Sequence, residues 1–455
     1  MLRPTAWSLG SGLLVLTALA MRLGSTPTAN LSYLLLGAYA LLGRTQAIQA
    51  LALSWLFSML SPGVAAEATY GTIGRYVVLA GAAVSVLLRS NILKRGRVGL
   101  VVWATILLGV FICLHAIFVS PMKDVSLLKA ISWTLACTTL ISAWSSLSPD
   151  DRYELDTQMF RGLVIIMLAS LPLLGTGTGY LVNGTGFQGV LNQPQAFGLT
   201  MAVLAAWAAS RALGSNPPSY TMMVLFVSCL ILIVLSEART AGLALLIALL
   251  LATVALQALT RRRMTSLFPA IKSRRFALFA IAALAIASLS APVLSGYIQS
   301  YLSKRGDASG LIDVYDRSRG RLIHDMWINI REHPWTGIGF GIASDPLSME
   351  VQRDPVLGLP VGASIEKGVL PLAVLEELGI PGAIAVLAWI WLLIRHSIRG
   401  RRLVPIALLF TALMLNMGEN ILFSPGGMGL LLLVIVGYAA SEKSSHSNAE
   451  STAHG

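Results

Sequence analysis

Long apolar segments recur along almost the whole chain, and they restrict the fold to helices that cross a membrane. A membrane-crossing helix needs about 20 predominantly apolar residues, and about 17 suffice. The segments 31–43, 46–60 and 426–440 are short and could be half-spans or re-entrant. We therefore predict an all-α polytopic membrane protein with about 12–14 transmembrane helices. The candidate spans lie near residues 7–23, 31–43, 46–60, 72–88, 98–118, 127–147, 159–177, 194–213, 220–236, 240–259, 276–297, 369–394, 403–423 and 426–440.

Basic residues set the expected orientation of these spans. Charged residues make up 12% of the chain, against about 25% in soluble domains. The formal net charge of +12 could suggest nucleic-acid binding, but short loops rich in Lys and Arg mark the cytoplasmic side of a membrane protein. The clusters at 89–97, 261–275 and 395–402 fall on one side when the spans alternate. We expect that side to be the cytoplasm, and we expect no nucleic-acid partner.

The same alternation places one long polar segment on the outer side. We divide the chain into a bundle of transmembrane helices (1–298), an outer loop with amphipathic helices (299–368), C-terminal transmembrane helices (369–440) and a disordered cytoplasmic tail (441–455). The loop holds His324 and His333, whose separation fits no metal-ligand motif. We therefore expect neither a metal site nor another cofactor.

Arginines are the most distinctive residues of the outer loop. The stretch 317–331 has apolar residues at helical spacing, with Arg317, Arg321 and Asp325 on another face. Such a helix could simply lie on anionic lipid. Alternatively, Arg319 or Arg321 could bind phosphate, since a guanidinium holds phosphate oxygens bidentately. Both alternatives remain open from the sequence.

Arg239 lies in a very short outer turn between two strong spans. An interfacial anchor or a pair with Glu237 would be an ordinary role for it. A pyrophosphate ligand is the functional alternative, because ionisable residues at membrane depth are functional candidates by default. On the same side, the span start at 192–195 contains Asn192 and Gln195, which could cap the helix or bind sugar hydroxyls.

Ionisable residues also cluster where the loop meets the next span. Glu366 and Lys367 close the loop, and Glu376 and Glu377 lie about two turns further on. A carboxylate at such a boundary suits a general base, and Glu366 is best placed for that role. Salt bridges inside the bundle are the alternative for Glu377 and for Glu419, which is expected near the outer end of the 403–423 span.

The order of these motifs resembles the O-antigen ligase and O-antigen polymerase superfamily of bacterial inner-membrane glycosyltransferases. The resemblance covers roughly residues 180–440. Each motif is loose alone, but their order and spacing are fairly specific. The matching segments are Asn-Gln-Pro-Gln at 192–195, Ser-Glu-Ala-Arg-Thr-Ala-Gly at 236–242, the stretch 320–341, and Leu-Glu-Glu-Leu-Gly-Ile-Pro-Gly at 375–382.

The resemblance implies a membrane-embedded, GT-C-like, metal-independent and inverting transferase. Its donor would be a glycan on undecaprenyl pyrophosphate, and its acceptor a sugar or lipid-linked sugar at the periplasmic face. Arg239 and one of Arg319 or Arg321 would hold the diphosphate, with Arg317, Lys367, Asn192, Gln195 and Glu377 as further substrate ligands.

The chain departs from many ligases of that superfamily at the expected base. A histidine is typical there, near Gly368, but this sequence has Glu366-Lys367-Gly368 and no histidine between His333 and His396. Glu366 is therefore our candidate base, and a polymerase of O-antigen or exopolysaccharide, or a ligase with another base, fits better than ordinary lipopolysaccharide ligation. A transporter of lipid-linked saccharides and a non-catalytic subunit of an envelope polysaccharide synthase are the competing interpretations.

Overall fold

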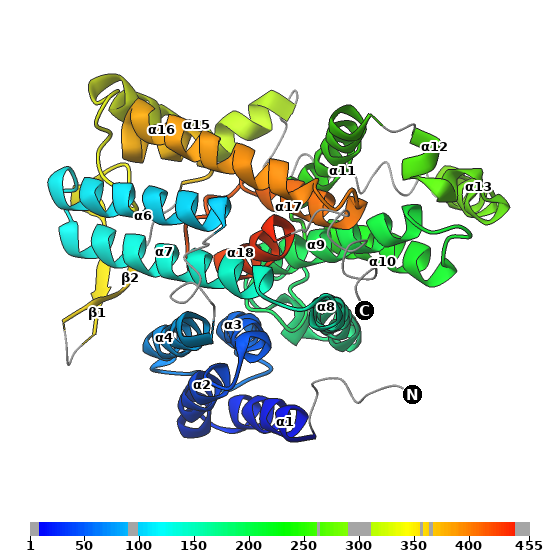
Figure 1. The fold of residues 1–455 in the computed structure, drawn as a ribbon, viewed down its shortest axis with the longest axis horizontal. Coiled ribbons are helices and arrows are strands. Elements are labelled where there is room, and N and C mark those ends of the chain that lie inside the picture. Colours follow the sequence, from blue (N-terminus) through cyan, green and yellow to red (C-terminus); the bar gives the residue numbers. More distant parts are fainter. Residues whose placement is uncertain are drawn as a thin grey trace, which may run out of the picture.

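The fold is known from a computed structural model that describes residues 9–89, 99–261, 264–289, 311–354, 358–363 and 367–441. Helices form almost all of this part (Figure 1). The first half contains α1 (Leu9–Gly24), α2 (Thr26–Ala40), α3 (Arg44–Met59), α4 (Gly71–Arg89), α6 (Leu100–Phe118), α7 (Lys123–Ser145), α8 (Pro149–Ser170), η1 (Leu171–Gly175), η2 (Gly177–Tyr180) and α9 (Pro194–Leu213). The second half contains α10 (Tyr220–Leu235), α11 (Arg239–Thr260), α12 (Met264–Leu267), η3 (Pro269–Lys272), α13 (Arg274–Leu289), α15 (Leu311–Glu332), η4 (Pro346–Ser348), β1 (Val351–Arg353), β2 (Pro360–Ala363), α16 (Leu370–Ser397), α17 (Leu403–Leu415) and α18 (Met428–Ala440).

The predicted all-α membrane fold is confirmed, because a helix coincides with every predicted span. By length and composition, 7 helices of the described residues can cross a membrane: α4, α6, α7, α8 with η1, α9, α11 and α16. Four shorter apolar helices, α1, α10, α17 and α18, accompany them. The protein is therefore a multi-pass membrane protein.

The last two helices are shorter than the apolar segments that predicted them. The span expected at 403–423 stops being helical at Leu415, because Asn416 rearranges the hydrogen bonds there. Its Oδ1 accepts from the backbone N–H groups of Ile421 and Leu422 at 2.9 and 2.8 Å. These bonds turn the chain away from the helix axis. Glu419, which we had expected near the end of a helix, therefore lies in the connection between α17 and α18.

Helices from both ends of the sequence share one core. All residues of α18 are buried, and α18 lies at the centre of the bundle beside α7 and α17 (Figure 1). Aromatic rings join these layers: the ring centroids of Trp133 on α7 and Phe423 before α18 are 4.8 Å apart, and those of Trp133 and Trp389 on α16 are 5.6 Å apart. Such offset and edge contacts stabilise a core beyond the apolar area that they bury.

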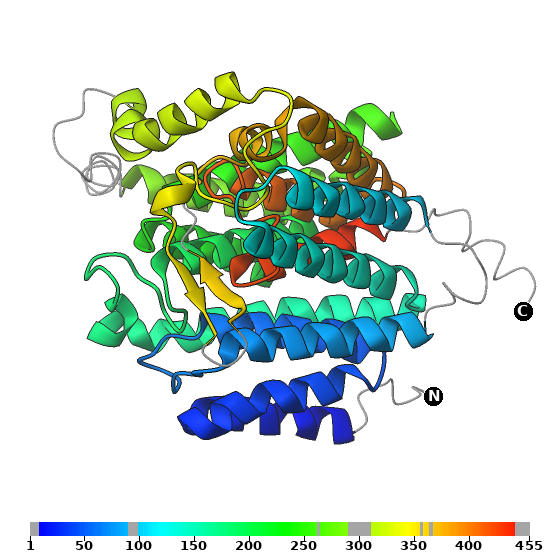
Figure 2. The same cartoon turned by 90° about the vertical axis from the view of Figure 1, so that its left-hand side faces the viewer.

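The segment from α15 to β2 covers one end of the bundle. β1 and β2 form an antiparallel hairpin, which stands across one end of α4 and α7 (Figure 2). An ion pair of 2.6 Å between Arg353 on β1 and Asp124 at the start of α7 fixes the hairpin to the bundle. The covered end is formed by the starts of α4 and α7 and by the connection before α18.

Candidate functional site at the covered end of the bundle

A break in α16 organises the covered end. Gly379 has φ 66° and ψ −172°, a conformation that disfavours residues with a Cβ atom, and Pro381 follows without a backbone N–H. The carbonyls of Glu376 and Glu377 therefore lose their partners within the helix. The backbone N–H groups of Ile338 and Gly339 replace them, at 2.8 and 3.1 Å.

The replacement bonds tie the segment after α15 to the broken helix. The N–H of Ile380 donates in return to the carbonyl oxygen of Pro334, at 2.9 Å. A Cβ atom on Gly379 would lie 2.4 Å from the Trp335 carbonyl oxygen, so the segment approaches α16 as closely as backbone allows. The backbone of Gly337 and Gly339 thus docks against α16, which the sequence alone did not indicate.

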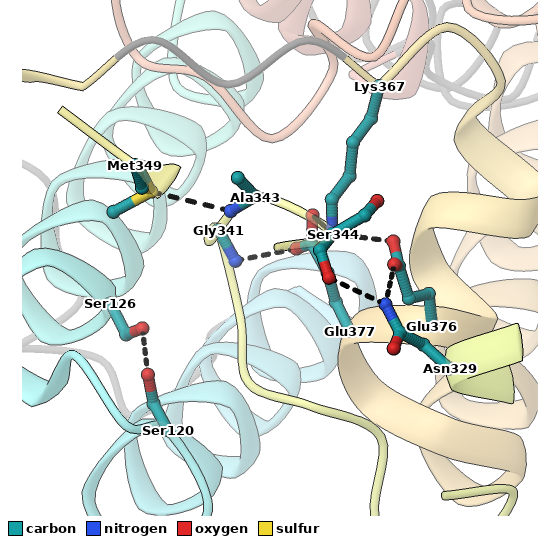
Figure 3. A network of polar contacts seen from close by, with 10 residues as sticks. All are labelled: Ser120, Ser126, Asn329, Gly341, Ala343, Ser344, Met349, Lys367, Glu376 and Glu377. Carbon is teal, nitrogen blue, oxygen red and sulfur yellow. Dashed lines mark hydrogen bonds and ion pairs between the residues drawn. The ribbon is translucent and has the colours of Figure 1, made fainter. Parts of the chain in front are cut away.

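A closed cluster of charges lies directly before the break (Figure 3). The ammonium of Lys367 contacts the carboxylates of Glu376 and Glu377, with N–O distances of 2.7 and 3.2 Å. Neutral donors complete the cluster: Asn329 Nδ2 donates to Glu376 Oε1 at 2.7 Å, and the N–H of Gly341 donates to Glu377 Oε2 at 2.6 Å.

The geometry of this cluster favours a salt bridge inside the bundle over a substrate-binding role for its charged residues. The side chains of Lys367 and Glu376 are 0% exposed, and that of Glu377 is 6% exposed. A buried ion pair is tolerated when further hydrogen bonds satisfy its atoms, as Asn329 and Gly341 do here. A substrate would have to displace one of these partners to reach Lys367 or Glu377, which we had expected to bind it. Glu366, our candidate base, lies outside the described residues.

The Arg239 turn is bent by an unusual backbone conformation. Glu237 has φ 56°, and Arg239 begins α11 directly after it. The hydroxyl of Thr185 donates to Glu237 Oε2 at 3.3 Å, which ties the turn to the loop before α9. Arg239 itself is half-buried. A Cβ atom on Gly418 would lie 2.5 Å from the Thr240 side chain, so the turn also contacts the connection between α17 and α18.

The arginine-rich stretch of the loop is helical, as predicted. Arg321 is exposed on α15, whereas the side chains of Arg317 and Arg319 lie outside the described part of the chain. The apolar stripe is only partly covered: Met326 is buried, but Trp327 is 45% exposed. The helix packs on α16 and leaves Arg321 accessible.

The start of α9 lacks the side-chain cap that was one alternative for Asn192 and Gln195. Gln193 is the N-cap residue, but its side chain makes no capping hydrogen bond. The N–H of Asn192 donates to the Met59 carbonyl oxygen at 2.7 Å. Asn192 Oδ1 is buried without a hydrogen-bond partner among the described residues, and Gln195 is exposed. Helix capping by these side chains was therefore the wrong alternative.

A cavity of about 410 Å³ opens beside these elements, and our sequence analysis did not identify its polar residues. Arg75 on α4, Lys129 on α7 and Asn420 before α18 contribute to its wall. Lys129 also lies 5.6 Å from the centroid of the Phe340 ring and interacts electrostatically with Glu377, so the cavity borders the charge cluster. Arg75 and Lys129 interrupt apolar spans, which was the signal that could have identified them.

Comparison with known protein families gives a match over part of the chain. Residues 224–387 match the family model described as O-antigen ligase. This match supports the resemblance to the O-antigen ligase and polymerase superfamily over the second half of the chain. The O-antigen ligase segment runs from α10 to α16 and contains Arg239, Arg321, the charge cluster and the break at Gly379. A search of curated proteins found no match to the chain.

The match supports an O-antigen ligase or polymerase type of function and suggests a glycosyltransferase-like enzyme. Arg75, Lys129 and Asn420 lie outside the O-antigen ligase segment. Among the described residues, no group of three or more His, Cys, Asp and Glu side chains could hold a metal ion.

Proposed function

We propose that the protein transfers a glycan from undecaprenyl pyrophosphate to an acceptor sugar hydroxyl at the periplasmic face of the bacterial inner membrane. The reaction would be metal-independent and inverting, and would serve polymerisation or ligation of O-antigen or exopolysaccharide. The observation that carries the proposal is the O-antigen ligase segment, which holds an accessible Arg321 and a half-buried Arg239 at the start of α11.

The proposed chemistry is a single displacement at the anomeric carbon. The acceptor oxygen forms a bond to that carbon as the bond to the diphosphate oxygen breaks, and the electron pair leaves with the diphosphate. Arg239 and Arg321, with Arg319 or Arg317 beside it on α15, would stabilise the growing negative charge. Fixed donors aimed at developing charge are commonly the largest contribution to enzymatic rate enhancement. Attack from the face opposite the leaving group inverts the anomeric configuration.

The acceptor proton needs a base, and we propose Glu366. A positioned general base typically contributes about 10²–10⁴-fold to the rate. The residues on either side of the undescribed segment support this assignment: Ala363 lines the cavity and Lys367 belongs to the charge cluster. Lys367 and Glu377 would then hold the loop end in place, and Asn192 and Gln195 would contact sugar hydroxyls.

A transfer assay with protein in lipid nanodiscs tests this proposal. The donor is the undecaprenyl-pyrophosphate glycan of the source organism, incubated with and without a chelator. We expect wild-type protein to lengthen the glycan or move it to another acceptor, and Arg239→Ala or Arg321→Ala to lower the rate at least a hundredfold. Glu366→Gln should lower the rate similarly while leaving donor binding intact.

Arg331→Gln is the matched control, because Arg331 is an exposed arginine on the same helix as Arg321. Wild-type rates in the arginine variants would contradict the proposed diphosphate site. Loss of transfer with chelator would contradict metal independence.

A further inference from the structure

The cavity at the covered end has the size of a small-molecule binding site. Its volume of about 410 Å³ falls within the range of about 300–1,000 Å³ typical of small-molecule sites. α4, α7, the β1–β2 hairpin and the connection before α18 form its wall. Ala363 on β2 also lines it, so the cavity reaches the strand that precedes Glu366.

Two cations in the wall, Arg75 and Lys129, form no close ion pair, and Glu377, which acts on Lys129 at longer range, already contacts Lys367. No carboxylate of the described residues lies within ion-pair distance of Arg75 or Lys129. Arg75 Nη2 makes a long contact of 3.4 Å with the Thr72 hydroxyl, and its Nη1 lies against Gly426. Two cations without a close counter-ion beside a partly apolar wall favour an oxyanion as ligand.

The wall also presents an acceptor, which distinguishes a sugar from a bare phosphate. Asn420 Oδ1 is buried and has no hydrogen-bond partner among the described residues. Leaving such an atom unpaired destabilises the site, so a ligand that donates to it is favoured. A sugar hydroxyl donates a hydrogen bond, whereas an ionised diphosphate cannot. An acid-bearing sugar satisfies the two cations and Asn420 together.

We propose that this cavity binds a sugar residue bearing a carboxylate, within the glycan that is transferred or extended. Arg75 and Lys129 would pair with the carboxylate, and Asn420 would accept from a ring hydroxyl. This inference rests on the proposed function and adds the class of sugar. Of the cavity-lining residues, Pro360 and Ala363 fall inside the O-antigen ligase segment, and the rest lie outside it.

Binding measurements on the full chain in nanodiscs test the inference. The probes are oligosaccharides of glucuronate and of galacturonate, neutral oligosaccharides of the same length and linkage, and inorganic pyrophosphate. We expect an acidic oligosaccharide to bind at least tenfold more tightly than its neutral counterpart. Arg75→Gln and Lys129→Gln should each abolish most of that preference, and Asn420→Leu should weaken both sugars.

Lys123→Gln and Arg331→Gln are matched controls, since both residues are exposed and neither lines the cavity. Arg75→Lys, which keeps the charge, should retain part of the preference and shows that loss is not misfolding. Equal binding of acidic and neutral sugars by wild-type protein would overturn the inference. Pyrophosphate binding that depends on Arg75 and Lys129, without preference for acidic sugars, would make the cavity a diphosphate site and would also overturn it.

Failure of this inference can be distinguished from failure of the proposed transferase activity. Arg239→Ala should lose transfer yet keep the preference for the acidic oligosaccharide, because Arg239 does not line the cavity. Transfer by wild-type protein without acidic-sugar preference would contradict the inference alone. The preference without transfer would support a saccharide site and contradict the enzymatic proposal.

Discussion

The side chains of Lys367, Glu376 and Glu377 form a closed cluster at the start of α16, and burial of the two carboxylates depends on the charge of Lys367. Lys367 neutralises part of the charge of Glu376 and Glu377, while Asn329 and Gly341 satisfy other carboxylate oxygens. Removing one partner of a buried pair leaves an uncompensated charge, which costs about 3–5 kcal/mol. The sequence indicated a salt bridge for Glu377, but Asn329 lies too far along the chain for any local pattern to reveal it.

Lys367→Met should therefore destabilise the protein by about 3–5 kcal/mol. Thermal unfolding in detergent, followed by tryptophan fluorescence, measures the change as a lower Tm. Adding Glu376→Gln and Glu377→Gln to Lys367→Met should recover part of the loss, since the stranded charges are removed. Lys123→Met, at an exposed lysine, should leave Tm unchanged. An unchanged Tm in Lys367→Met would mean that the buried cluster does not stabilise the fold.

At the scale of elements, α16 is two helical segments joined by a hydrogen-bonded break rather than one continuous span. The sequence predicted a single helix there, because Gly and Pro also occur in helices that remain continuous. What fixes the break is the segment after α15, whose N–H groups reach the carbonyls of Glu376 and Glu377. The contact joins residues far apart in sequence, so only the folded chain reveals it.

Gly379→Ala should disrupt this junction. A residue with a Cβ atom at φ 66° is strained by about 1–3 kcal/mol, and the Cβ atom would also meet the Trp335 carbonyl oxygen. We expect a lower Tm and faster proteolysis of the 333–341 segment. Gly162→Ala in α8 is the control, because nothing lies within 4 Å of the new methyl group and Ala favours a helix. Equal stability of the two variants would contradict the role assigned to Gly379.

For the whole molecule, apolar length and periodicity were enough to predict where the helices lie, since each span carries its own signal. They could not predict the cavity, because Arg75, Lys129 and Asn420 meet only after three distant elements pack together. The ends of helices such as α17 also escaped prediction, since the side chain of Asn416 decides them. The predicted orientation of the spans in the membrane follows from basic clusters spread along the whole chain, which we expect on the cytoplasmic side.

Cysteine accessibility in intact cells tests that orientation. Leu347 is 98% exposed at the covered end, and Lys272 is exposed in the basic connection after α11. With the outer membrane permeabilised, a membrane-impermeant thiol reagent should label Leu347→Cys but should label Lys272→Cys only after lysis. Cys113 is half-buried, so both changes are made on a Cys113→Ala background. The reverse labelling pattern would invert the proposed topology.

The central claim is that the chain performs transfer rather than transport, and sealed proteoliposomes separate the two. Purified protein is reconstituted with the lipid-linked glycan donor, and the lipids are then analysed by mass spectrometry. We predict new undecaprenyl diphosphate in amounts that match the glycan transferred, abolished by Arg239→Ala and unaffected by Arg331→Gln. A donor that stays chemically intact while it crosses the bilayer in a protein-dependent way would contradict the transferase account and favour a transporter.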